Sequence, residues 1–192
     1  MTKMALVAMA AVMGTLGWAR SADVKSDRTV TVCFEKASGD VADNAEMIAS
    51  RMFQNIGVKL EWRDRRICQA ENVIIVSLST RTPHNLLPGA LAYALPYEGV
   101  HIEVFYDRMA QANAEVLPYI LAHVLVHEIT HILQGVNLHS ASGIMKAHWE
   151  KDDYSHMDTK PLAFTAADID LIYKGLAARA AANATPRLLA AR

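Results

Sequence analysis

A long apolar helical pattern that contains a His-Glu-x-x-His pentapeptide constrains this chain more than any other feature of its sequence. Residues 117–134 are apolar enough to predict a helix that runs through the centre of a domain. Pro118 suits the first turn of this helix, and Gly135 suits its C-terminal cap. Because a charged carboxylate in the middle of a bilayer is costly, Glu128 argues against a membrane span. We therefore expect a buried helix of a globular domain, with residues 127–131 (His-Glu-Ile-Thr-His) in its second half.

The spacing within the pentapeptide predicts a metal site. On a helix, His127 and His131 lie one turn apart on the same face, which is the separation at which two imidazoles bind one zinc ion. Glu128 projects about 100° around the helix from His127, so it can face a metal-bound water without being a ligand. The plain alternative is a pair of ordinary core histidines that flank a glutamate. We expect His127 and His131 to be metal ligands and Glu128 to be a general base.

A catalytic zinc ion needs a third protein ligand and an open position for water. After Gly135 ends the helix the chain can turn back, and His139 follows four residues later. The rival third ligand is Glu150, because thermolysin-like enzymes place a glutamate about that far along, on a second helix. Gly143 and an aperiodic polar pattern argue against such a helix here. His139 is therefore the expected third ligand, with Glu150 as the alternative.

The remaining histidines have plainer expectations. His123 lies one turn before His127, but a straight helix cannot offer three consecutive turns to one ion, so His123 is expected to pack or to form hydrogen bonds behind the ligands. His84, His148 and His156 are most simply surface residues. A contact between bound substrate and either His148 or His156 is the alternative.

The run from His127 to Met145 resembles the metzincins, a clan of zinc endopeptidases with an extended His-Glu-x-x-His motif and a methionine turn (Met-turn). The resemblance implies that Met145 is the methionine of the Met-turn, that Zn²⁺ is the cofactor and that a peptide or protein is the substrate. More weakly, residues 91–96 (Leu-Ala-Tyr-Ala-Leu-Pro) and the strand expected at residues 101–106 look like the substrate-edge segment of the matrixin branch. The whole run also looks like that of small secreted bacterial proteins of this clan.

The glycine and the third histidine depart from the usual metzincin spacing. In that motif the glycine comes three residues after the second histidine, and the third histidine comes three residues after the glycine. Here Gly135 lies four residues after His131, and His139 lies four residues after Gly135. We expect a helix that is one residue longer, followed by a looser turn. Some relatives place a tyrosine ligand two residues past the methionine, where this chain has Ala147, and Tyr154 is the residue that could replace it.

The rest of the chain alternates strands and helices and then continues in helices. The resemblance implies an α+β, metzincin-like zincin domain, with a mixed and mostly parallel sheet packed on an active-site helix, a Met-turn and a C-terminal helix. Thr165 and Asp168 form a capping-box pattern at the start of the last helix. Strands are expected at residues 29–34, 58–62, 72–78 and 101–106, helices at 41–56, 117–134 and 165–181, and a loop at 81–92.

The first residues of the chain have the composition of a secretory signal. Lys3 is followed by an uncharged stretch at residues 4–18 and then by Ala-Arg-Ser at residues 19–21. We expect a signal peptide at residues 1–21, with an uncleaved N-terminal anchor as the alternative. With no repeat and no linker in the sequence, residues 22–181 form one metalloprotease-like catalytic domain, and residues 182–192 form a disordered tail.

The two cysteines agree with export. Cys33 and Cys68 both follow the expected signal, and an even number of cysteines in an oxidising compartment predicts a disulfide bond. Two unpaired, buried thiols are the alternative. The expected location is therefore extracellular or periplasmic.

The net charge of −1 and the pI of about 6.7 give no indication of nucleic-acid binding. The fifteen residues of the first apolar stretch fall short of the roughly 20 that span a bilayer. We expect neither a nucleic-acid partner nor stable membrane insertion of the mature chain.

Three hypotheses about function follow, in decreasing order of support. The first is a zinc-dependent endopeptidase that hydrolyses peptide bonds with a zinc-bound water and Glu128 as general base, with His139 or, in a thermolysin-like variant, Glu150 as the third ligand. The second is a zinc-stabilised binding module without catalysis, which would not require Glu128. The third is an exported structural domain without a metal.

Overall fold

The computed structural model describes residues 28–35, 39–68, 72–84, 89–95, 98 and 100–184. Within these residues one sheet is formed by β1 (Thr29–Phe34), β2 (Lys59–Asp64), β3 (Ile74–Ser79), β4 (Ala92–Ala94) and β5 (His101–Phe105). Their order across the sheet is β2-β1-β3-β5-β4. The first four strands in this order are parallel, and β4 is antiparallel to β5 at one edge. The mixed, mostly parallel sheet expected from the sequence is confirmed.

The inner strand β1 illustrates why this sequence forms a sheet that is covered on both faces. Its sequence, Thr-Val-Thr-Val-Cys-Phe, is rich in β-branched side chains, which fit a pleated surface. The consecutive residues Val32, Cys33 and Phe34 are all buried. Because successive side chains of a strand point to opposite faces, both faces of the sheet are covered here.

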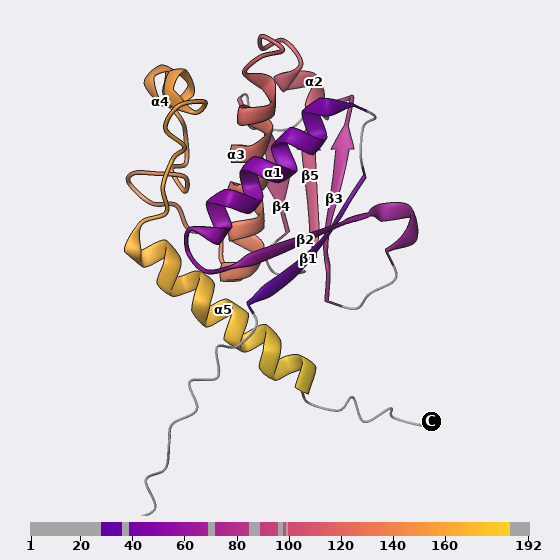
Figure 1. Ribbon diagram of the computed structural model, residues 1–192, viewed down its shortest axis with the longest axis vertical. Helices are drawn as coiled ribbons and strands as arrows, with labels where there is room; N and C mark the ends of the chain where they lie inside the picture. The colour runs from indigo at the N-terminus through magenta and orange to yellow at the C-terminus, as the bar shows by residue number, and fades with distance from the viewer. Residues whose placement is uncertain are drawn as a thin grey trace, which may run out of the picture.

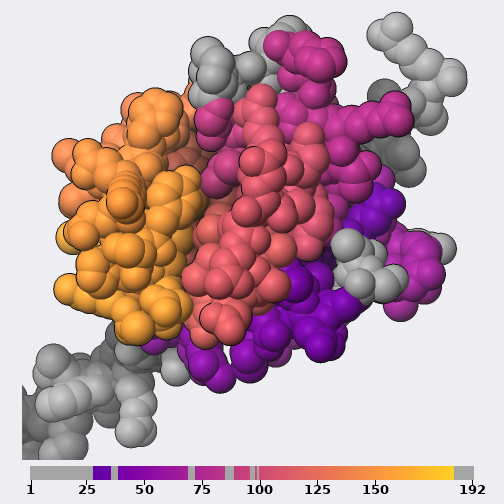
Figure 2. Space-filling view, turned by 90° about the horizontal axis from the view of Figure 1, so that it is seen from above, coloured from indigo at the N-terminus to yellow at the C-terminus, as the bar shows by residue number. Residues whose placement is uncertain are grey.

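Three long helices accompany the sheet: α1 (Asp40–Gln54), α3 (Leu117–Gln134) and α5 (Ala166–Ala184). α1 packs against α3, and α3 also packs against α5. Figure 1 shows α5, in yellow, running along one end of the molecule, while the short helix α4 lies away from the strands. In Figure 2 the residues that follow α3, in orange and yellow, occupy one side of the molecule. The shorter elements are α2 (Tyr106–Met109), α4 (Lys151–His156) and the 3₁₀ helix η1 (Arg65–Ile67).

The central helix α3 has the bounds that the sequence predicts. Pro118 lies in its first turn, and Gly135 caps its end with φ 68° and ψ 18°, donating its N–H to the carbonyl of His131 at 3.0 Å. This left-handed conformation has little steric cost for glycine. Most of the helix is buried, including His127 and Glu128, so polar groups are held in the interior of the domain.

Gly175 allows α5 to cross α3 at close range. A Cβ atom at this position would lie 1.6 Å from the carbonyl oxygen of Leu133 near the end of α3. No side chain fits in that space, so the helix crossing requires glycine. The crossing fixes α5 against the end of α3 that carries the pentapeptide.

Several bounds differ from the sequence-based predictions. α4 was not predicted, because it has only six residues and a polar sequence. The strand expected at residues 101–106 ends at Phe105, because α2 begins at Tyr106, and β4 begins at Ala92, the last residue of the expected loop. The capping box of α5 is confirmed, since the N–H of Thr165 donates to Asp168 Oδ2 at 2.8 Å and the N–H of Asp168 donates to Thr165 Oγ1 at 3.2 Å.

The ends of the chain are described only in part. α5 continues to Ala184, three residues beyond the predicted end of the last helix. The signal peptide expected at residues 1–21 and the part of the tail beyond residue 184 lie outside the described residues. None of the helices within the described part of the chain combines the length and the apolar character needed to cross a membrane.

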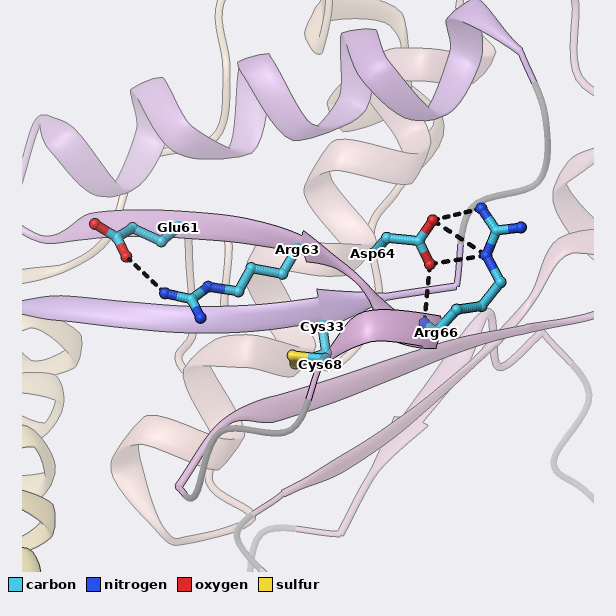
Figure 3. The surroundings of a disulfide bond; sticks show 6 residues. All are labelled: Cys33, Glu61, Arg63, Asp64, Arg66 and Cys68. Carbon is cyan, nitrogen blue, oxygen red and sulfur yellow. Dashed lines mark hydrogen bonds and ion pairs between the residues drawn. A yellow bond between two sulfur atoms is a disulfide. The ribbon is translucent and has the colours of Figure 1, made fainter.

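The predicted disulfide bond is confirmed. It joins Cys33, near the end of β1, to Cys68, which follows η1, with 6.0 Å between the two Cα atoms. Figure 3 shows the bond beside β2, where the charged side chains form ion pairs at the surface. Arg66 Nη2 lies 2.6 Å from Asp64 Oδ2, and its side chain is 85% exposed. Exposed pairs of this kind contribute little to stability, whereas the disulfide links β1 covalently to the segment after β2.

Candidate metal centre

Three histidines converge at the end of α3. Ligand nitrogens of His127, His131 and His139 all lie within 4.8 Å of one another. The distances between ring centroids are 4.8 Å for His127 and His131, 5.3 Å for His127 and His139, and 4.9 Å for His131 and His139. Within the described part of the chain, this is the one group of three or more such side chains close enough to hold a metal ion.

Hydrogen bonds set the orientation of the two helical imidazoles. Nδ1 of His127 lies 2.8 Å from the carbonyl oxygen of Ile144, and Nδ1 of His131 lies 3.2 Å from that of Val136. A carbonyl oxygen only accepts, so each Nδ1 carries the hydrogen and each Nε2 keeps a free lone pair. Backbone carbonyls hold metal-binding histidines in this way in many proteins.

The two free lone pairs face each other. Nε2 of His127 and Nε2 of His131 are 3.1 Å apart, and neither can donate a hydrogen to the other. Two nitrogens bound to one tetrahedral zinc ion at about 2.0–2.1 Å lie roughly 3.3–3.4 Å apart. Burial lowers the pKa of both imidazoles to about 4, so both are neutral at neutral pH, which is the form that binds metal. The donor set therefore fits a divalent cation.

His139 reaches the cluster through the turn that follows α3. The left-handed cap at Gly135 reverses the direction of the chain, as expected for the looser spacing of this sequence. Ser140, the next residue after His139, donates its N–H to the carbonyl of Met145 at 2.8 Å. His139 is exposed, whereas His127 and His131 are buried, so the cluster is open to solvent on one side.

The segment around Gly143 folds beneath the histidines with an unusually close backbone contact. Gly143 has φ 76°, and a Cβ atom there would lie 2.2 Å from the carbonyl oxygen of Ala163. The next residue, Ile144, donates its N–H to the same carbonyl at 3.0 Å. Met145 follows and is fully buried. Glycine at this position is thus required for the contact that brings the carbonyl of Ile144 to His127.

Glu128 lies beside the histidines and lines the same cleft. Its side chain accepts a hydrogen bond from the backbone N–H of Ala94 in β4, and burial raises its pKa to about 8. A divalent cation held by the histidines would favour the ionised carboxylate, which is the form that can accept a proton. The structure therefore brings together the candidate base and the three candidate ligands that were selected from the sequence.

The cleft has a volume of about 600 Å³. One wall is residues 89–94, including β4, and another is formed by residues 146–149 together with Tyr154, while α3 contributes His127, Glu128 and His131. The outer edge strand β4 pairs only with β5 among the described strands. An extended chain can therefore reach both an unpaired strand edge and the histidine cluster.

The structure distinguishes the other candidate residues by their exposure and by whether they line the cleft. Glu150 caps the start of α4 with its side chain 79% exposed, 3.7 Å from Lys146 Nζ, and it is not part of the histidine cluster. His148 and Tyr154 line the cleft, whereas His84 and His156 are exposed and do not line it. His123 is fully buried and bonded to backbone groups, as expected.

Trp149 was not singled out from the sequence. Its Nε1–H donates to the carbonyl oxygen of Ile144 at 3.2 Å, and its ring packs edge-on against His127 with 5.7 Å between centroids. No local pattern marks it, because its role depends on where the loop places it. A second contact without a local signal joins Ser140 Oγ to Asp168 Oδ1 at 2.6 Å.

Comparisons with known proteins agree with this architecture. No model of a known protein family matches the chain, and no curated protein matches it in sequence. Its structure is similar to that of archaemetzincin from Methanopyrus kandleri, with a TM-score of 0.58 and 13% sequence identity, covering 79% of this chain and 97% of that chain. At this identity the likeness concerns the fold, a mixed α/β domain with a mostly parallel sheet.

Proposed function

We propose that the protein is a zinc-dependent endopeptidase. The observation that carries the proposal is the convergence of three histidine donors and one buried glutamate in an open cleft. Three histidines with an open fourth position are typical of catalytic rather than structural zinc sites. The likeness in fold to archaemetzincin supports the same assignment to the metzincin-like class.

In this proposal His127, His131 and His139 hold the zinc ion. When bound, zinc supplies Lewis-acid chemistry that polarises a peptide carbonyl and makes water more acidic. Glu128 acts as general base: it takes a proton from the attacking water and passes it to the departing amine. Met145 is the methionine of a Met-turn, with its buried side chain supporting the loop that follows His139.

The substrate is a peptide or a protein in extended conformation. It would add to the free edge of β4 by main-chain hydrogen bonds, which places a scissile bond next to Glu128. Glu128 accepts a bond from the N–H of Ala94, so the base already lies at that edge, and a substrate strand that pairs with Ala94 would take this donor over. We further propose that the protein is secreted or periplasmic, with a signal at residues 1–21, a catalytic domain at 22–181 and a tail at 182–192, and the disulfide supports export.

Two alternatives are less well supported. A thermolysin-like site would use Glu150, whose side chain is directed to solvent at the start of α4. A zinc-stabilised binding module would usually have a closed site with four protein ligands, whereas His139 lies at an open cleft.

Metal content and cleavage test the proposal together. Elemental analysis of the purified protein is expected to give one zinc per chain, which His139→Ala loses and Glu150→Ala keeps. A peptide library should then be cleaved by the wild type and by Glu150→Ala. Absence of zinc from the wild type, even after zinc is added back, would contradict the proposal, and loss of zinc with Glu150 would favour the thermolysin-like alternative.

A further inference from the structure

A closed ring of hydrogen bonds begins and ends on α3. From His123 it passes to Leu162, continues through Ala163 to Ile144, and returns to α3 at His127, one turn after His123. The segments it joins are far apart in sequence. The ring therefore connects a buried histidine outside the metal cluster to one of the candidate ligands.

The first half of the ring fixes His123 in one orientation. Its Nδ1 lies 2.7 Å from the carbonyl oxygen of Tyr119, which only accepts, so Nδ1 carries the hydrogen. Its Nε2 is then an acceptor, and it receives the N–H of Leu162 at 3.1 Å. Burial lowers the pKa of His123, which favours this neutral form. An imidazole in this state uses both nitrogens within the protein and has none left for a metal.

The second half of the ring sets the position of one carbonyl. Ala163 accepts the N–H of Ile144 at 3.0 Å, and the carbonyl of Ile144 accepts Nδ1–H of His127 at 2.8 Å. Trp149 reinforces this point, because its Nε1–H donates to the same carbonyl and its ring lies edge-on to both His123 and His127. The direction of the His127 lone pair thus depends on where residues 162–163 lie.

We propose that His123 is a positioning residue of the metal centre, holding residues 162–163 so that the carbonyl of Ile144 orients His127. This inference rests on the proposed function, because it concerns the same metal ligands. His123 itself is not part of the histidine cluster and does not line the cleft. Its contribution is the acceptor at Nε2, without which the N–H of Leu162 loses its partner and the Ile144 segment is free to shift.

Metal affinity and a spectroscopic signature test the role of His123 in the full chain. His123→Phe keeps a planar ring of similar size but removes the acceptor, and His123→Gln offers a side-chain oxygen near the position of Nε2. Loss of residues that support metal ligands typically weakens metal binding 10–100-fold. We expect His123→Phe to weaken zinc binding about tenfold and to change the visible absorption of the Co²⁺-substituted protein, and His123→Gln to restore most of both.

A matched control comes from the same helix. Thr130 is also fully buried and polar, but among the described residues its Oγ1 bonds only to the carbonyl of Val126 within α3. Thr130→Val is expected to alter stability without changing zinc affinity or the Co²⁺ spectrum. Equal loss of zinc affinity in this control would assign the effect of His123→Phe to general loosening of the helix and would overturn the proposal.

Gly143, which precedes Ile144 of the ring, supplies a second variant. Gly143→Ala forces Ala163 and Ile144 apart, because its Cβ would lie 2.2 Å from the Ala163 carbonyl oxygen. If both residues act through the same ring, the double variant His123→Phe/Gly143→Ala should lose hardly more zinc affinity than the weaker-binding single variant. Additive losses would overturn the proposal. Should His123→Phe fail to fold, a folded Gly143→Ala with unchanged zinc affinity would overturn it as well.

Failure of this inference and failure of the proposed function give different results. A wild type that binds no zinc contradicts the proposed function. A wild type that binds zinc and cleaves peptides, together with a folded His123→Phe of equal zinc affinity and identical Co²⁺ spectrum, contradicts only the role of His123. A His123→Gln variant that is no better than His123→Phe would also exclude the Leu162 hydrogen bond as the cause.

Discussion

The two parts of the candidate metal centre are held in place in different ways. His127 and His131 lie on α3, whose backbone hydrogen bonds are local and whose residues are mostly buried. His139 lies in residues 136–149, here called the return segment, which contains no regular helix and is fixed by bonds to α3, to Ala163 and to Asp168. The comparison teaches that the helix supplies stability and two donors at a fixed distance, while the return segment determines how those donors are aimed.

The largest expected effect concerns the chemistry on the helical side. Glu128→Gln should lower kcat/KM for a fluorogenic peptide by about 100- to 10,000-fold, because an amide cannot take the proton of the attacking water. Zinc content should stay at one per chain, since Glu128 is not a proposed ligand. Cleavage at the wild-type rate would show that Glu128 is not the base.

The next effect concerns the stability of a region that lies away from the metal centre. Replacing Cys33 and Cys68 with alanine opens a loop of 35 residues, which should lower the free energy of unfolding by about 3–4 kcal/mol in the chain-entropy model. Urea unfolding of the two proteins measures this difference. Zinc affinity should not change, because the disulfide lies at β1 and not at the cleft. A fall in zinc affinity in the same variant would contradict the independence of the metal centre from the disulfide.

Replacing a candidate ligand from each part should show that the two parts contribute differently to the stability of the metal-free protein. His131→Ala and His139→Ala should both weaken zinc binding more than the roughly 10–100-fold typical of supporting residues. In the metal-free protein only His131→Ala should be destabilising, by about 1–3 kcal/mol, because it leaves a cavity at a buried position and removes the hydrogen bond to the part-buried Val136 carbonyl. Calorimetry in the presence of a chelator tests this difference, and equal melting temperatures for the two variants would argue against it.

The smallest effect concerns the hydrogen bond that joins the return segment to Asp168. Ser140→Ala removes the hydrogen bond to Asp168 and should cost about 1 kcal/mol of stability. Ser155→Ala is the matched control, because Ser155 Oγ bonds only to neighbouring groups of the exposed helix α4. Chemical unfolding of both variants is the measurement, and a control that loses as much as Ser140→Ala would show that the Asp168 link has no special weight.

Local signals explain why α3 was predicted correctly. Its bounds follow from apolar content, from proline in the first turn and from glycine at the cap, and all of these act within a few residues. The same holds for the capping box of α5 at Thr165 and Asp168. The convergence of His127, His131 and His139 followed from helical spacing together with the turn after Gly135.

Contacts between distant segments explain what the sequence did not reveal. The ring through Leu162 and Ile144 and the packing of Trp149 depend on which loops meet in space, and no periodicity encodes that. The short helix α4 is a different case, because the capping box at its start is formed by Glu150 and Asp153 and so lacks the residue types that mark a capping box in a sequence. Its six polar residues give no amphipathic pattern, so a search for helical periodicity passes over it.

The glycine cap of α3 has a consequence for how motifs of this kind vary among proteins. The orientations of His127 and His131 are set by carbonyl groups of Ile144 and Val136, and the chain reverses at a single left-handed residue. The spacing on either side of Gly135 is one residue longer here than in the usual metzincin motif, and the three histidines still converge. A pattern with fixed spacing between the second histidine and the third therefore describes only part of the sequences that can bring three histidines together in this way.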